Sequence, residues 1–181
     1  MSRVARDRDD LLLGEWACLG ILCAEPSHGF AVSVRLRPSG DVGRVWSLSR
    51  PLTYRAIDRL IECGYVAPIA SEPGIAGGNR TILGITTEGR EVLNDWLDRP
   101  VRHLRDLRSE LLLKLQLART LGIDSSELMK SQRRIVSELR QNLESSQDGD
   151  DIVSLWRIEA ADAALRFLDA VVTPRRRPGS A

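Results

Sequence analysis

A short segment, residues 47–66, constrains the fold most strongly, because it encodes both ends of a helix and the start of a strand. Pro51 is tolerated in the first turn of a helix, where its missing amide would have had no partner. Ser49, just before it, can accept a hydrogen bond from a first-turn amide. Gly64 supplies the left-handed residue that ends many helices. The segment therefore predicts a helix of about 13 residues that leads directly into a strand.

Successive side chains of a helix point about 100° apart, so the predicted helix has two distinct faces. We expect one face to pack on a core, and it collects Thr53, Tyr54, Ile57, Leu60 and Ile61. The opposite face collects Leu52, Arg55 and Arg59. An arginine face on an isolated helix is usually a solvated surface, so its function depends on the surrounding elements.

The neighbouring segments supply that context. Residues 10–24 have a helical pattern, and so does a shorter stretch that Pro26-Ser27 caps and residues 38–41 end. Two strand-like runs, 65–71 and 81–86, follow the central helix and are joined by a glycine-rich link. Three helices and a hairpin in this order predict a winged helix-turn-helix, whose third helix enters the major groove of DNA.

The hairpin is expected to form the wing. Residues 44–48 have the pattern of a short third strand or an extended lead-in that pairs with it, with Trp46 filling the gap between hairpin and helices. The link 73–79 lacks the Gly-Lys-Ser/Thr ending of a phosphate-binding P-loop, which is therefore excluded. Asn79 and Arg80 lie where a wing tip contacts phosphate or the minor groove. The alternative is a flexible loop with one exposed arginine.

The second half of the chain is purely helical in pattern. Thr86 caps a helix predicted for residues 87–97, and the proline that follows marks a domain boundary. We predict a DNA-binding domain at 1–100, a helical domain at 101–172 with three apolar stripes, and a disordered basic tail at 173–181. The fold class is mainly α with a minor β component, an amino-terminal winged helix-turn-helix followed by an all-helical carboxy-terminal dimerisation domain.

Composition excludes several classes of protein. The chain has 181 residues, 43% apolar and 28% charged, which are globular values. No run approaches the roughly 18 apolar residues of a membrane span, and the amino terminus lacks the apolar region of a signal peptide. We expect a cytoplasmic protein that does not associate with a membrane. Three cysteines without metal-ligand spacing fit reduced core residues, so no metal and no cofactor is predicted; they are Cys18, Cys23 and Cys63.

Catalysis is not predicted. An enzyme needs a nucleophile, an acid–base pair or a metal cluster. The chain has two histidines, His28 and His103, and neither lies in a catalytic motif. His28 lies at the start of the expected second helix, where we interpret it as structural. We therefore name no catalytic residue.

Several stretches resemble PadR-type transcriptional regulators. Residues 52–66 resemble the recognition helix of that family, and His28-Gly29-Phe30 resembles the signature that opens its second helix. Residues 85–91, with Trp96-Leu97, resemble the exit from its wing. Residues from about 104 to 172 resemble the helical carboxy-terminal domain of its virulence-activator-like members. The chain departs from the family at Leu52, where a small residue is usual.

The resemblance implies a sequence-specific DNA-binding regulator, and specifically a repressor. It also implies a homodimer formed through the carboxy-terminal helices, which would bind a pseudo-palindromic operator in double-stranded DNA. Regulators of this type include ones that respond to phenolic or other aromatic compounds, so we expect release by a small aromatic effector. The alternative is a protein–protein adaptor that uses the winged fold without reading DNA.

Positive charge is concentrated where DNA recognition would occur. Net charge is only +1, yet residues 35–59 contain six arginines and two aspartates. We expect Arg55 to read a guanine edge, whereas Arg50 and Arg80 meet phosphates. The complete set of expected DNA contacts is Ser49, Arg50, Leu52, Thr53, Tyr54, Arg55, Arg59, Asn79 and Arg80.

Three tryptophans are candidates for an effector site. Trp16, Trp96 and Trp156 are expected near the junction of the two domains, where a flat apolar ligand could stack on them. The alternative is that all three are core packing.

Overall fold

The protein divides into two compact units, seen in a computed structural model that describes residues 11–73, 79–145 and 151–172. The first unit comprises Met1–Leu97 with Leu112–Ile123, and the second comprises Asp98–Leu111 with Asp124–Ala181. The single boundary predicted at residue 100 differs from this division, because Leu112–Ile123 belongs to the first unit. The predicted disordered tail at 173–181 lies outside the described residues.

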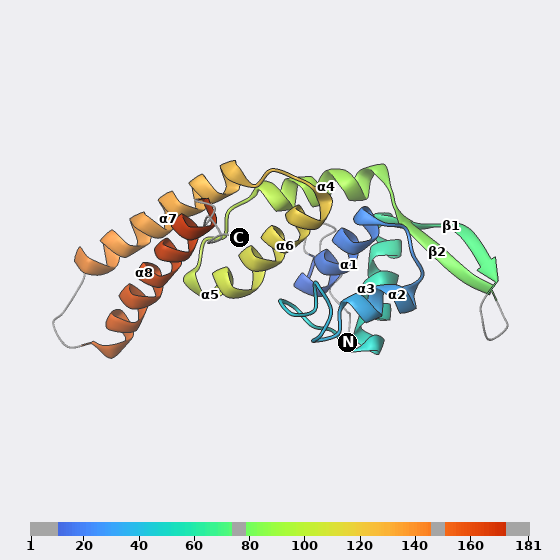
Figure 1. Ribbon diagram of the computed structural model, residues 1–181, viewed down its shortest axis with the longest axis horizontal. Helices are drawn as coiled ribbons and strands as arrows, with labels where there is room; N and C mark the ends of the chain where they lie inside the picture. Colours follow the sequence, from blue (N-terminus) through green and yellow to red (C-terminus); the bar gives the residue numbers. More distant parts are fainter. Residues whose placement is uncertain (1–10, 74–78, 146–150, 173–181) are drawn as a thin grey trace, which may run out of the picture. The chain divides into compact units, whose positions relative to one another are not determined.

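The first unit has the element order of a winged helix-turn-helix, and the predicted fold class is confirmed. Three helices lead into a two-stranded antiparallel hairpin, and a fourth helix follows the wing (Figure 1). The elements are α1 (Leu13–Ala24), α2 (Gly29–Arg35), α3 (Arg50–Glu62), β1 (Val66–Pro73), β2 (Asn79–Ile85), α4 (Thr87–Asp98) and α6 (Leu112–Leu121).

Helix α1 forms the centre of this unit. All nine residues from Gly14 to Leu22 are buried, because α1 contacts α2, α3, α6 and β2. On the α6 side, the buried Leu117 side chain lies against Gly20. Helix α6 is therefore part of the core of the winged unit, although the segment Asp98–Leu111 of the other unit precedes it in the chain.

Helix α3 has the length and the limits that the sequence predicts. It contains 13 residues, has Pro51 in its first turn, and is followed by Gly64 at φ +81°. The predicted side-chain cap is wrong, because the Ser49 hydroxyl makes no capping hydrogen bond. Instead, the Ser49 carbonyl accepts hydrogen bonds from both the amide and the hydroxyl of Thr53, at 2.9 and 3.1 Å.

The wing pairs differently from the expectation. The β1–β2 register runs from Val66 opposite Ile85 to Pro73 opposite Asn79. The prediction of a third strand at 44–48 is wrong, because residues 41–46 form turns. Ser27 takes that place and exchanges two hydrogen bonds with Leu83, each 3.0 Å long.

The second unit is helical. It contains α5 (Leu104–Asp106), a π-helical turn (Leu107–Leu111), α7 (Ser126–Ser145) and α8 (Ile152–Val172). Two of the three helical stretches predicted after residue 100 correspond to α7 and α8, whereas the first is divided between α5, the π-helical turn and α6 of the first unit. Helices α7 and α8 pack together and are joined by the ion pairs Arg133–Asp169 and Arg140–Asp162. None of the described helices combines the length and apolar character needed to cross a membrane.

A buried amide fixes the start of the second unit to α7. The Gln132 side chain, fully buried, accepts a hydrogen bond from the Val101 amide at 2.8 Å and donates one to the Val101 carbonyl at 2.9 Å. The amide and the carbonyl of Val101 are thereby satisfied by a side chain of α7 instead of by backbone groups.

Candidate nucleic-acid interface

The two faces of α3 are separated much as the sequence predicts, with corrections at the edges. Thr53 is fully buried, so the prediction that it contacts DNA is wrong. Tyr54 and Ile61 were expected in the core but are 38% and 39% exposed. Tyr54 lies against Gly29 of α2, where an added Cβ would come within 2.9 Å of the ring, so one side of the ring packs and the other faces solvent.

The outward arc of α3 presents Arg55. This side chain is exposed and makes no hydrogen bond or ion pair with any residue that the structure describes. Leu52, one turn earlier, is 47% exposed. Arg59 is less available, because it is half-buried and its Nη1 lies 3.6 Å from Glu62 Oε2. Arg55 is therefore the arginine of this helix best placed to meet a partner.

A cluster of rings and guanidinium groups lies at the start of α3. Phe30 of α2 is 43% exposed, and the guanidinium carbons of Arg50 and Arg37 lie 5.4 and 6.0 Å from its ring centroid. Arg50 also lies 5.7 Å from the Tyr54 ring. Phe30, Arg37, Arg50 and Tyr54 form what we call the Phe30 cluster. Cation–π contacts orient a guanidinium without neutralising it, so the cluster keeps its charge for an anionic partner.

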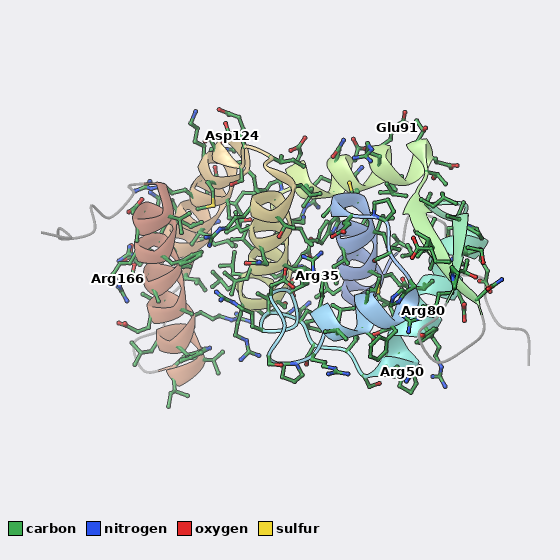
Figure 2. All side chains as sticks on the ribbon, turned by 45° about the vertical axis from the view of Figure 1, so that its right-hand side comes forward. Arg35, Arg50, Arg80, Glu91, Asp124 and Arg166 are labelled. Carbon is green, nitrogen blue, oxygen red and sulfur yellow. The ribbon has the colours of Figure 1, made fainter. Side chains whose placement is uncertain are left out.

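Arg80 of β2 is close to the start of α2. Its Nη1 lies 3.4 Å from His28 Nε2, and the side chain is half-buried. Figure 2 shows the labelled Arg50 and Arg80 side chains in the part of the first unit that carries the hairpin. Asn79, beside Arg80, is exposed and faces Pro73 across the hairpin. The helix cap expected at Ser27 is instead His28, whose Nδ1 accepts the Ala31 amide at 3.1 Å.

One arginine of the basic segment is neutralised within the fold. Arg35 donates hydrogen bonds to both carboxylate oxygens of Asp41, at 3.1 and 2.5 Å. These bonds hold the pKa of Asp41 below its usual value. Arg44, by contrast, is exposed and has no partner within the described part of the chain. The positive surface therefore rests on Arg37, Arg44, Arg50, Arg55 and Arg80.

Two of the three candidate effector tryptophans come together. Trp16 and Trp96 are buried and stack with ring centroids 4.7 Å apart at an interplanar angle of 7°. The Nζ of the buried Lys114 lies 4.7 Å from the centroid of the Trp96 ring. Trp156 belongs to the second unit and is 71% exposed. The stacked pair has the burial of core residues, which favours the core-packing alternative for Trp16 and Trp96.

The three cysteines all lie in the first unit. Cys18 and Cys63 are buried, and burial raises the pKa of the Cys18 thiol well above its usual range. The half-buried Cys23 accepts a hydrogen bond from Arg90 Nη1 at 3.1 Å. Among the described residues, no group of three or more His, Cys, Asp or Glu side chains is placed to hold a metal ion.

The predicted DNA contacts did not include Arg37 of the positive surface, nor His28 and Phe30, which lie beside its arginines. The motif His28-Gly29-Phe30 was noticed for its resemblance to a family signature, but its sequence alone does not tell whether Phe30 is buried. The 43% exposure of Phe30 follows from the position of α2, which only the three-dimensional packing determines.

The solved structures that this chain resembles include two crystal structures of PadR from Bacillus subtilis, one of them in complex with operator DNA. The complex is 16% identical in sequence, with 88% of this chain and 97% of that chain covered and a TM-score of 0.46. The other structure is also 16% identical, with 93% and 96% covered and a TM-score of 0.42. No family model matches the chain, and no curated protein matches it.

Proposed function

We propose that the protein is a sequence-specific DNA-binding transcriptional regulator that inserts α3 into the major groove. The observation that carries the proposal is the outward face of α3, where Arg55 is exposed and has no partner among the described side chains. A helix that follows a helix and a turn, with a guanidinium on its free face, is the arrangement that major-groove readers use.

The side chains divide into two roles by position. Arg55 is a base reader, because a guanidinium can donate two hydrogen bonds to the O6 and N7 atoms of guanine. Leu52, exposed one turn earlier, offers an apolar contact to a thymine methyl group. Arg50 and Arg80 flank the helix and contact phosphates, which position the protein without specifying sequence.

We further propose a homodimer formed through the second unit. Helix α8 leaves large apolar side chains exposed, which are Ile152, Val153, Leu155, Trp156, Phe167 and Val171. An isologous pair of such faces buries them and gives two recognition helices one or more DNA turns apart, a turn being about 34 Å. The resemblance to PadR-type regulators implies that the bound dimer represses.

The placement of the three tryptophans does not favour a site for an aromatic effector. Trp16 and Trp96 already cover each other in the core of the first unit. Trp156 is instead assigned to the dimer surface through its exposure on α8.

The test is selection of bound sequences from a random pool of duplex DNA. The full chain should enrich an inverted repeat, and fluorescence anisotropy should show tighter binding to the selected duplex than to a scrambled one. Arg55→Glu should enrich nothing, because it places a carboxylate against the base edges. Arg119→Glu makes the same charge change at an exposed position of α6 and should enrich the same repeat. Failure of the unaltered chain to enrich any sequence would contradict the proposal and favour the protein–protein adaptor.

A further inference from the structure

The starting point is the tautomer of His28. The backbone amide of Ala31 lies 3.1 Å from His28 Nδ1 and can only donate a hydrogen bond. Nδ1 must therefore present its lone pair, and a neutral imidazole then carries its proton on Nε2. The cap of α2 thus fixes which ring nitrogen is the donor.

Two hydrogen-bond donors consequently face each other. His28 Nε2 and Arg80 Nη1 are 3.4 Å apart, longer than a normal hydrogen bond between nitrogens. A guanidinium has no acceptor, so this contact is not a hydrogen bond when Nε2 carries the proton. Within the described residues, no side chain or carbonyl accepts from either nitrogen at this point.

We infer that His28 Nε2–H and Arg80 Nη1–H form a two-donor clamp for a single phosphodiester oxygen. An oxygen at a hydrogen-bond distance of about 2.9 Å from both nitrogens completes the triangle. This inference rests on the proposed function, since DNA supplies the phosphodiester. In this clamp His28 has a second role in addition to capping α2, and the partner of Arg80 is the phosphodiester oxygen.

The surroundings favour an anion at this position. The Phe30 ring lies 6.3 Å from the His28 ring, and it carries Arg50 on one side and Arg37 nearby, at 5.4 and 6.0 Å. The nearest cross-strand neighbour of Arg80 is Glu72, and no ion pair joins the two among the described contacts. An incoming phosphate therefore meets donors and positive charge that the fold leaves uncompensated.

The tautomer can be tested on the protein alone. Long-range proton–nitrogen NMR correlation distinguishes the two neutral tautomers. The chain contains only two histidines, so the spectrum shows the signals of only two imidazole rings. In its neutral form His28 should carry its proton on Nε2, and His103→Asn assigns the signals. Adding inorganic phosphate at constant ionic strength should shift the Nε2 signal, whereas adding chloride should not. A proton on Nδ1 would overturn the inference.

Duplex binding then tests the clamp as a unit. His28→Asn keeps a capping oxygen for the Ala31 amide but removes the distant N–H. His28→Asn and Arg80→Ala should each weaken binding to a random-sequence 20-base-pair duplex roughly tenfold, the loss expected for one charge-assisted hydrogen bond. The double variant should bind about as weakly as either single variant. Arg119→Ala, an exposed arginine of α6, is the matched control and should change affinity less than twofold.

The outcomes separate this inference from the proposed function. If the unaltered chain binds duplex and His28→Asn behaves like the Arg119 control, the clamp is wrong while DNA binding stands. Additive losses in the double variant would also contradict the clamp, since independent contacts add. If the chain binds no duplex at all, the proposed function fails, and the phosphate-induced shift of the His28 signal then decides whether the two donors still hold a free phosphate.

Discussion

Helices α3 and α8 differ in the kind of side chain that they expose to solvent. Helix α3 buries one face in its own unit and exposes a charged side chain, Arg55, on the other face. Helix α8 is longer, at 21 residues, and leaves large apolar side chains exposed, including Trp156 at 71% and Ile152 at 79%. The first unit thus closes its core within one chain, whereas the second presents an apolar surface of the kind that marks a protein interface.

The largest expected effect concerns the exposed apolar surface of α8. In the proposed dimer, Trp156→Glu buries a carboxylate in place of an aromatic anchor and should cost about 4 kcal/mol of association free energy. Sedimentation at micromolar concentration should then change from twice the chain mass of 20.1 kDa to that mass. Arg166→Glu, at an exposed polar position of α8, should leave the dimer intact. A monomeric unaltered chain would contradict the dimer.

The next effect tests whether the core of the first unit is closed by α6. Leu117→Ala removes a fully buried side chain that lies against Gly20 and should lower the free energy of unfolding by about 3 kcal/mol. Urea unfolding followed by tryptophan fluorescence measures it, because Trp16 and Trp96 lie in the same unit. Leu115→Ala, half-buried outside the core cluster, should cost clearly less. Equal losses would show that α6 does not complete this core.

A smaller effect concerns the second unit. Gln132→Ala leaves the buried amide and carbonyl of Val101 without their partners and should cost about 2 kcal/mol. Hydrogen exchange should show faster exchange at the Val101 amide. The exposed Gln141, replaced by Ala, is the control and should change neither quantity beyond about 0.5 kcal/mol. Unchanged exchange at Val101 would rule out the proposed role of the Gln132 amide.

The smallest effect depends on pH. The hydrogen bonds from Arg35 lower the pKa of Asp41 in the folded protein, so the ion pair stabilises the fold at neutral pH. This stabilisation is lost as the pH falls from about 3.9, the usual pKa of an aspartate, through the lowered pKa of the folded protein. Because Asp41 is 46% exposed, Asp41→Asn should cost only about 0.5 kcal/mol at pH 7. The difference from the unaltered protein should disappear in acid. Asp58→Asn, at an exposed carboxylate with no partner among the described residues, is the matched control for the substitution itself.

Local signals made the elements predictable. Pro51 and Gly64 determine the limits of α3 through backbone conformations that few other residues adopt, and the structure has both limits where the sequence puts them. Thr86 was predicted to cap α4, and its hydroxyl does accept the Gly89 amide at 3.0 Å. These features depend on a few neighbouring residues, so the sequence alone contains them.

The element against which each helix face packs was not predictable in this way. The apolar stripe of α6 was visible, but nothing in its spacing tells that it packs on α1 rather than on its neighbours in sequence. The segment 44–48 was predicted to be extended, yet the amide of Gly43 donates to the Arg35 carbonyl at 2.9 Å and the chain turns there. Thr53 was placed on the correct face of α3, but its inclusion among the DNA contacts ignored that this face is buried.

The central claim is that α3 reads bases through Arg55, and comparison of Arg55→Ala with Arg80→Ala tests it most directly. Both variants are titrated onto the selected duplex and a scrambled one at several salt concentrations. Arg55→Ala should cost roughly 1 to 3 kcal/mol on the selected duplex and relax preference at one position, with a much smaller loss on the scrambled duplex. Arg80→Ala should weaken both duplexes alike and lower the salt slope by about one unit. Equal losses on both duplexes for Arg55→Ala, or no loss on either, would contradict the claim.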